Sequence, residues 1–252
     1  MYRRAHNWLF LLLLLGAATE VWAQTPVAVP RISVQVGTAQ GPKDVAVTLQ
    51  VLILMTLLTL APAFLIMTTA FTRIVVVLAF LRTAIGTPTI PPNQVLIGLS
   101  LFLTFFVMAP VLDDINRNAL QPYLNNRISF QQALSNAEKP SRAFMLRQTY
   151  EKDLQLFINL SKPKTPPRTP DDVPITVVIP AFILSELKTA FIIGFYIYIP
   201  FLIIDMFVAS TLMSMGMMML PPIVISLPFK LLVFIMANGW TLLIGSLVAG
   251  FK

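Results

Sequence analysis

The sequence predicts an all-α membrane protein: apolar helical hairpins that assemble into a multi-subunit helical channel, with one small helical region outside the membrane. Of its 252 residues, 56% are hydrophobic and only 12% are charged, whereas soluble domains carry about 25% charged residues. The apolar residues gather into stretches long enough to cross a bilayer, which requires about 20 apolar residues in a row. Only residues 113–172 have the polar composition of a soluble segment.

The first 23 residues have the organisation of a secretory signal peptide. Arg3 and Arg4 precede a short apolar core, and "VWA" at residues 21–23 is a small-residue cleavage site. The alternative is a first membrane anchor, but the apolar core is too short to span a bilayer. We therefore expect cleavage after Ala23 and an exported N-terminus, followed by a polar periplasmic tail over residues 24–44.

Residues 45–112 contain two apolar segments that we expect to form a first helical hairpin. One runs from Val45 to Phe71 and the other from Val95 to Leu112. The connection between them carries Arg73 and Arg82 but no acidic residue. The positive-inside rule therefore predicts that this connection faces the cytoplasm, in agreement with an exported N-terminus.

Residues 113–172 are expected to form a periplasmic helical region. The segment opens with "DDINRN" and closes with "SKPKTPPRTPDD". Pro140 suits the first position of a helix, and apolar residues from Leu146 to Phe157 follow at helical spacing. We expect one amphipathic helix that packs on a neighbour. The basic residues do not conflict with export, because long translocated loops escape the positive-inside rule.

Residues 173–252 are expected to form a second apolar hairpin with a methionine-rich tip. The tip reads "MSMGMMML" at residues 213–220, and Pro221 and Pro222 follow it. Methionine is flexible and polarizable and fills irregular space, so the run is either soft packing or an adaptable constriction. Several glycines in the arms would let helices approach closely; these are Gly194, Gly239, Gly245 and Gly250.

Four ionisable residues interrupt the apolar sequence of the second hairpin: Glu186, Lys188, Asp205 and Lys230. Each would cost roughly 2.5–3.5 kcal/mol at the bilayer centre, so each should pair or face water. Asp205 and Lys230 lie 12 and 13 residues from Met217. A helical hairpin would bring both to one depth, roughly 18 Å behind the tip. They are expected to pair, within one hairpin or between neighbouring copies.

Several function classes are excluded by composition. The chain has no cysteine, and its one histidine, His6, lies in the expected signal peptide. Disulfides, thiolate or histidine metal sites and Ser-His-Asp catalysis are therefore ruled out for the mature chain. The net charge is +7, and the basic residues that produce it are scattered along the chain. This distribution favours contact with lipid headgroups over nucleic-acid binding. An aspartyl protease would need a second Asp beside Asp205. We expect no enzyme activity, metal or cofactor.

Long stretches of the chain resemble the FliP family of flagellar type III export-gate subunits. The resemblance covers about residues 52–250 and rests on five stretches: "FTRIVVVLAFLR" (71–82), "PPNQVLIGLSLFLTFFVMAPV" (91–111), "PAFILSELKTAFIIGFYIYIPFLIIDM" (180–206), "MGMMMLPPIVISLPFKLLVF" (215–234) and "GWTLL" (239–243).

The resemblance implies a non-enzymatic channel subunit in the bacterial inner membrane, at the flagellar basal body. Several copies would assemble with the FliQ and FliR proteins around a central channel, next to the FlhA and FlhB proteins, and pass unfolded flagellar proteins outward. The family's methionine gasket maps onto Met217, Met218 and Met219, and its inter-subunit ion pair onto Asp205 and Lys230. The resemblance also implies that not every apolar helix is an ordinary membrane span.

Two positions depart from the family pattern, and two other functions stay open. Ile192 stands where the family has a polar residue, and Asn238 where it has an acidic one.

An injectisome relative shares the motifs, but the signal peptide, the long periplasmic loop and "MMMLPP" favour the flagellar type. A proton-coupled small-solute transporter would instead use Glu186 and Asp205 as a relay, although no inverted repeat is evident.

Overall fold

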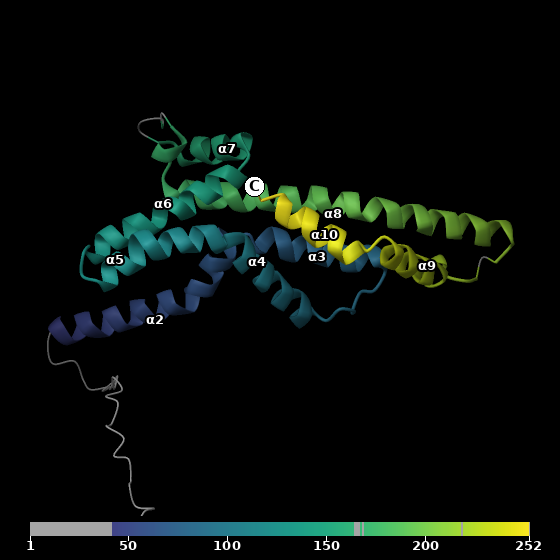
Figure 1. Cartoon of the computed structure of the whole chain (residues 1–252), viewed down its shortest axis with the longest axis horizontal. Helices are drawn as coiled ribbons and strands as arrows, with labels where there is room; N and C mark the ends of the chain where they lie inside the picture. Colours follow the sequence, from purple (N-terminus) through teal and green to yellow (C-terminus); the bar gives the residue numbers. More distant parts are fainter. Residues whose placement is uncertain (1–41, 164–166, 168, 218, 252) are drawn as a thin grey trace, which may run out of the picture. The chain divides into compact units, whose positions relative to one another are not determined.

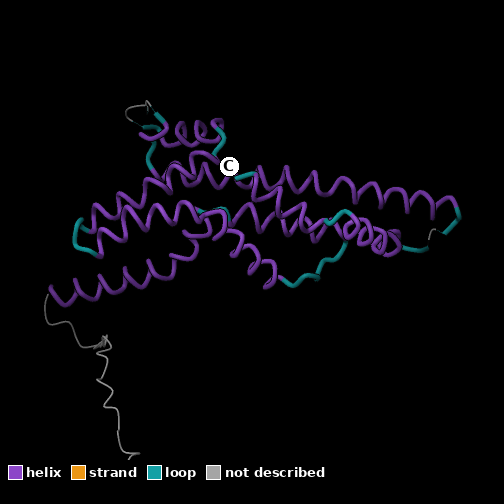
Figure 2. The backbone as a smooth tube through the Cα atoms, in the orientation of Figure 1, coloured by secondary structure: helices purple, strands orange, loops and turns teal. Residues whose placement is uncertain are grey.

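The computed structural model describes residues 42–163, 167, 169–217 and 219–251. Every regular element in these residues is helical, which confirms the all-α prediction (Figure 2). The expected signal peptide and most of the expected tail, residues 1–41, lie outside the described residues. The chain divides into two units, Met1–Val51 and Leu52–Lys252. The packing reported below is that of the second unit.

Figure 1 labels the helices in chain order. They are α2 (Pro42–Thr68), α3 (Phe71–Ile85), α4 (Asn93–Ile115), α5 (Gln121–Leu124), α6 (Phe130–Gln148), α7 (Glu151–Ser161), α8 (Ile175–Ser214), α9 (Pro222–Met236) and α10 (Gly239–Ala249). The π-helical segment η1 (Asn116–Leu120) joins α4 to α5, and the 3-10 turn η2 (Pro170–Asp172) precedes α8.

Helix α3 is a core helix, where the sequence predicted only a connection. Its residues Ile74, Val77, Leu78 and Leu81 are buried at helical spacing, and α3 packs along α8 and against α4 and α9. Arg73 is 3% exposed, so it cannot serve as a topology charge at a cytoplasmic surface. The structure therefore differs from the predicted first hairpin by a buried helix between its two arms.

The region between η1 and α8 also differs from its prediction. Helix α6 begins ten residues before Pro140, because Ser129 and Gln132 form a reciprocal capping box at its N-terminus. Pro140 lies inside α6. The chain then breaks at Thr149 and Tyr150, where the backbone is extended, so two helices stand where one was expected. Both pack on a neighbour as predicted, since α6 and α7 each contact α8.

Helices α8 and α9 run back along each other and are joined by the methionine-rich turn (Figure 1). Helix α8 has 40 residues, which makes it about 60 Å long. The second arm is not continuous: α9 and α10 are bent by 63° at Ala237 and Asn238. Asn238 permits this bend because it adopts a left-handed backbone with φ 51°, a conformation that asparagine tolerates well.

Three helices in the described part of the chain are long and apolar enough to cross a membrane. They are Leu49–Thr68, Asn93–Leu124 and Ile175–Ser214, and the bent pair α9–α10 would be a fourth if it counts as one span. These lengths and compositions agree with the predicted membrane protein.

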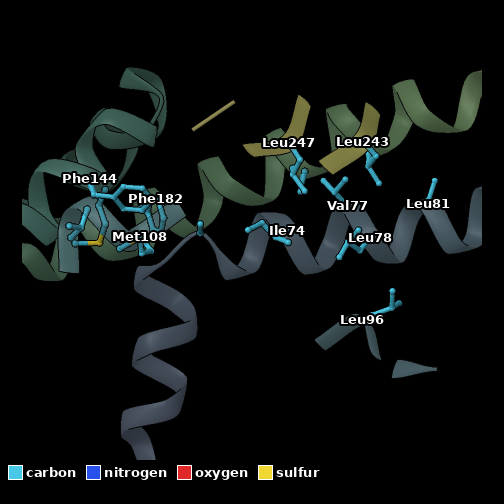
Figure 3. Packing of buried hydrophobic residues seen from close by; sticks show 14 of the residues in the cluster. Ile74, Val77, Leu78, Leu81, Leu96, Met108, Phe144, Phe182, Leu243 and Leu247 are labelled. Carbon is cyan, nitrogen blue, oxygen red and sulfur yellow. The ribbon is translucent and has the colours of Figure 1, made fainter. Parts of the chain in front are cut away.

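The hydrophobic core joins α3, α8 and α10 at one end and α4, α6 and α8 at the other. In Figure 3, Leu243 and Leu247 of α10 point toward Val77 of α3, and Phe144, Phe182 and Met108 form a second group. Close packing of α3 on α8 depends on Gly194, because a Cβ there would lie 2.6 Å from the Phe80 ring. A Cβ added to Gly245, by contrast, would have no heavy atom within 4 Å apart from its chain neighbours and the backbone of its own helix.

Candidate functional site: a methionine turn and the charged residues of α8

A Schellman turn closes the C-terminus of α8 at the methionine run. The Met217 amide donates to the Leu212 carbonyl at 3.0 Å, and the Gly216 amide donates to the Met213 carbonyl at 3.1 Å. This hydrogen-bond pair requires a left-handed residue after the helix cap, and Gly216 provides it with φ 75°. The pattern Met-Ser-Met-Gly-Met is therefore a helix stop, with methionines on both sides of the left-handed Gly216 in the sequence.

The methionines of this turn are exposed on the chain that carries them. The exposed fractions are 63% for Met213, 67% for Met215, 39% for Met217 and 100% for Met219. Met218, the middle member of the predicted gasket, lies outside the described residues. The interpretation of the run as soft packing inside the chain does not fit these exposures. The exposures fit a surface of flexible side chains that contacts another molecule.

Asp205 and Lys230 are brought together within one chain. Lys230 Nζ lies 2.5 Å from Asp205 Oδ2, and the Ser226 hydroxyl donates to Asp205 Oδ1 at 2.5 Å. The Lys230 side chain is nearly buried, and that of Asp205 is 21% exposed. Pairing within the hairpin was one of the two arrangements left open by the sequence; pairing between copies stays a prediction. The sequence did not predict Ser226 as a partner of Asp205, although Ser226 lies one helical turn before Lys230 and shares its helix face.

Glu186 pairs with Arg73, which the sequence predicted to lie in the cytoplasmic connection of the first hairpin. Arg73 Nε donates to Glu186 Oε2 at 2.9 Å, and Arg73 Nη2 donates to Glu186 Oε1. The same guanidinium reaches Gln148 Oε1 at 3.0 Å and the Gly250 carbonyl at 3.2 Å, and it stacks on the Phe251 ring. Arg73 thus ties α3 to α8, to the end of α6 and to the end of α10. Its opposite charge to Glu186 was the signal that could have suggested the pair.

Lys188 pairs with Asp153 of α7 and not with nearby Glu186. The Ser185 hydroxyl donates to Asp153 Oδ2 at 2.9 Å, and the Tyr150 amide donates to Ser185 Oγ at 3.0 Å. Asp153 is buried. The "SELK" segment of α8 therefore holds two different helices, α3 through Glu186 and α7 through Ser185 and Lys188. No local pattern in the sequence indicated Asp153 as a partner.

These contacts favour structural pairing over proton or solute chemistry. Both carboxylates of the transporter alternative, Glu186 and Asp205, are held by cations. No group of three or more His, Asp or Glu side chains among the described residues is placed to hold a metal ion. An open cleft of about 490 Å³ between α4 and α10 has an apolar lining and no titratable residue; it is lined by Leu103, Phe106, Ile244, Gly245, Val248 and Ala249.

Comparisons with known proteins agree with the resemblance. The FliP family model matches residues 54–247. The flagellar biosynthetic protein FliP of Bacillus subtilis (strain 168) is 53% identical over 218 residues, covering 86% of this chain and 98% of the relative. Those of Pectobacterium carotovorum subsp. carotovorum and Aquifex aeolicus (strain VF5) are 52% and 49% identical, covering 94% and 96% of this chain and 90% and 98% of the relatives. The chain belongs to the FliP family.

Proposed function

We propose that this chain is a channel-forming subunit of the flagellar type III protein export gate, and that unfolded flagellar proteins pass a constriction lined by Met217, Met218 and Met219. Family membership supports the flagellar setting, because the relatives are named flagellar biosynthetic proteins. The observation that carries the constriction is the exposure of the methionines at the tip of the α8–α9 hairpin.

The constriction would act as a steric and dewetting seal. Apolar side chains that converge in a narrow pore exclude water and ions. Methionine suits a seal that must open for many sequences, because its unbranched side chain repacks around different surfaces. The Asp205–Lys230 pair fixes the register of α8 against α9 behind the tip, and so would hold the methionines at a constant height in each copy.

Assembly would supply the neighbours that the exposed apolar surface needs. Helix α8, about 60 Å long, is twice the thickness of a bilayer core of about 30 Å. Exposed large apolar residues follow it, among them Phe195, Tyr196 and Phe207. In this proposal several copies, with the FliQ and FliR proteins, cover those residues in the inner membrane at the basal body, beside the FlhA and FlhB proteins. Residues 113–172 would lie on the periplasmic side.

The test of the seal replaces Met217, Met218 and Met219 together by alanine. Ion leakage through the membrane of cells that express the assembled gate should rise, because the shorter side chains leave the pore open to water. Met206→Ala is the matched control, since Met206 is an exposed methionine of α8 away from the turn. Unchanged leakage in the triple variant would reject the seal.

A second test addresses the assembly. Co-expression with candidate partner proteins, followed by mass measurement of the intact complex, should give a particle with several copies of this chain. Recovery of a lone, stable monomer would contradict the gate.

A further inference from the structure

We propose that the turn over residues 213–217 binds a soft monovalent metal ion, Cu(I), through the thioether sulfurs of Met213, Met215 and Met217. Soft thioether ligands select Cu(I) over harder cations. The turn offers three of them at alternate positions, and their side chains are exposed and not packed in the core of the chain. The site shares Met217 with the proposed seal and does not include Met218 or Met219.

The backbone supports a shared site because it closes these residues into one small loop. The amide of Met217 reaches back to Leu212 across the Schellman turn, so the three methionines lie on the last turn of α8 and on the residues that reverse it. Ser214, the polar side chain between them, donates its hydroxyl to the Thr211 carbonyl at 2.8 Å. The unbranched methionine side chains are flexible enough to bring their sulfurs to one ion.

The chemistry of the surroundings favours Cu(I) over other ions. Zn²⁺ prefers thiolate, imidazole and carboxylate ligands, and Mg²⁺ and Ca²⁺ prefer oxygen. The whole chain has no cysteine, and the carboxylate of Asp205, the acidic residue nearest in sequence, is engaged by Lys230 and Ser226. A thioether has no proton to lose, so binding should not depend on pH near neutrality, unlike binding by cysteine or histidine.

Occupancy would alter the proposed constriction, because Met217 belongs to both. A bound Cu(I) adds a positive charge at the seal and fixes side chains that the seal needs to be mobile. This consequence rests on the proposed function. The binding itself is measured on the purified chain and does not depend on export.

The experiment is an anaerobic titration of the full chain in detergent micelles, in which it competes with bicinchoninate for Cu(I). The chain should withdraw about one Cu(I) per molecule, through soft thioether ligands, and the affinity should stay constant from about pH 6 to about pH 8. X-ray absorption at the copper edge should show sulfur neighbours only. Replacing Met213, Met215 and Met217 together by leucine, a volume-conserving change, should abolish the binding.

The matched control replaces three other exposed methionines by leucine, each on a different helix: Met55, Met206 and Met236. This variant should bind Cu(I) as the native chain does. The site is rejected if the native chain leaves the metal with the chelator, if absorption shows nitrogen or oxygen neighbours, or if the control loses binding as the turn variant does. The absorption spectrum is taken on the native chain, so it stands even if a variant folds poorly. If the alanine variant of the seal leaks but the native chain does not bind Cu(I), this site alone is rejected. If the native chain binds Cu(I) but the alanine variant does not leak, only the seal is rejected.

Discussion

Arg73 and Glu186 carry opposite charges in a place almost closed to solvent. Arg73 is 3% exposed and Glu186 is fully buried, and their bidentate contact has the geometry in which an arginine–carboxylate pair is strongest. Removing one partner of such a pair leaves a charge in an apolar interior, which is more harmful than removing both. The role of Arg73 is therefore structural.

We predict that Arg73→Met lowers the free energy of unfolding by about 3–5 kcal/mol, because Glu186 would be left buried and unpaired. Denaturant unfolding in detergent micelles, followed by helical circular dichroism, measures the change. The double variant Arg73→Met, Glu186→Leu should recover much of the loss. Arg117→Ala is the control: its partner is Asp113 and both side chains are exposed, at 74% and 54%. Equal losses in Arg73→Met and in the control would contradict the prediction.

Ser226 has a role that its residue type alone would not suggest. Its hydroxyl is fully buried and donates to Asp205. We predict that Ser226→Ala lowers the free energy of unfolding by about 1.5–3 kcal/mol, the range for a hydrogen bond to a charged group. The same unfolding experiment measures it. Ser161→Ala removes an exposed hydroxyl that bonds only within α7 and should change stability by less than about 0.5 kcal/mol. A neutral Ser226→Ala would show that Lys230 alone fixes Asp205.

At the scale of elements, the contact of α3 with α8 depends on a missing side chain. A Cβ on Gly194 would lie 2.6 Å from two ring atoms of Phe80 and 3.0 Å from its Cβ, so the helices would have to separate. We predict that Gly194→Ala costs about 1–3 kcal/mol, as overpacking does, with a lower midpoint of thermal unfolding as the readout. Gly98→Ala, with nothing within 4 Å, should instead stabilise α4 by about 0.5–1 kcal/mol. A stabilising Gly194→Ala would mean that Phe80 moves aside freely.

The break between α9 and α10 depends on the backbone of Asn238, whose φ is 51°. The resemblance drew attention to a missing acidic charge here, but the structure shows that conformation is what the position demands. We predict that Asn238→Gly leaves stability nearly unchanged, whereas Asn238→Val costs about 1–2 kcal/mol, the penalty of the left-handed region for a residue with a branched Cβ. Thermal unfolding of the two variants compares them. Equal stability of the two would show that the bend relaxes without this conformation.

The sequence predicted long apolar helices well and short or interrupted ones poorly. Residues 175–214 were predictable as helical because their apolar sequence is long and only three charged residues interrupt it. Helix α3 was missed because its apolar run is short and flanked by arginines. The opposite charge of Glu186 could have suggested a partner for Arg73, but Glu186 lies 113 residues away and the fold is needed to bring the two together. Pro140 suits a helix start, but the capping box at Ser129 starts α6 earlier. The Asp205–Lys230 pair was predictable because hairpin geometry fixes equal depth, whereas Asp153 belongs to a helix whose packing no local pattern specified.

At the scale of the whole molecule, the described residues leave a large apolar surface uncovered by the chain itself. Its described residues expose large apolar side chains along α2, α4, α8 and α9, far more than a soluble monomer tolerates. Lipid covers apolar surface only over a bilayer core of about 30 Å, and α8 extends about 60 Å. In the proposed gate, neighbouring copies would cover the exposed part of α8 that lipid does not reach.

The remaining question at this scale is whether Asp205 and Lys230 pair within a chain, as the structure shows, or between copies, as the resemblance implies. Charge exchange separates the two. Asp205→Lys and Lys230→Asp each place like charges together at the centre of the hairpin, and each should sharply reduce the yield of folded protein in the membrane fraction. Both changes in one chain restore opposite charges, so the yield should recover.

The decisive comparison is a mixture in which the two single variants are co-expressed with different tags. Pairing within the chain predicts no rescue, because neither chain contains a complementary pair, and each hairpin must fold before it can meet a neighbour. Pairing between copies predicts rescue, because the lysine introduced at position 205 of one chain would face the aspartate introduced at position 230 of the next. Rescue of the mixture would show that assembly exchanges the in-chain pair for an inter-subunit one; its absence would leave the pair as a brace that each chain forms for itself.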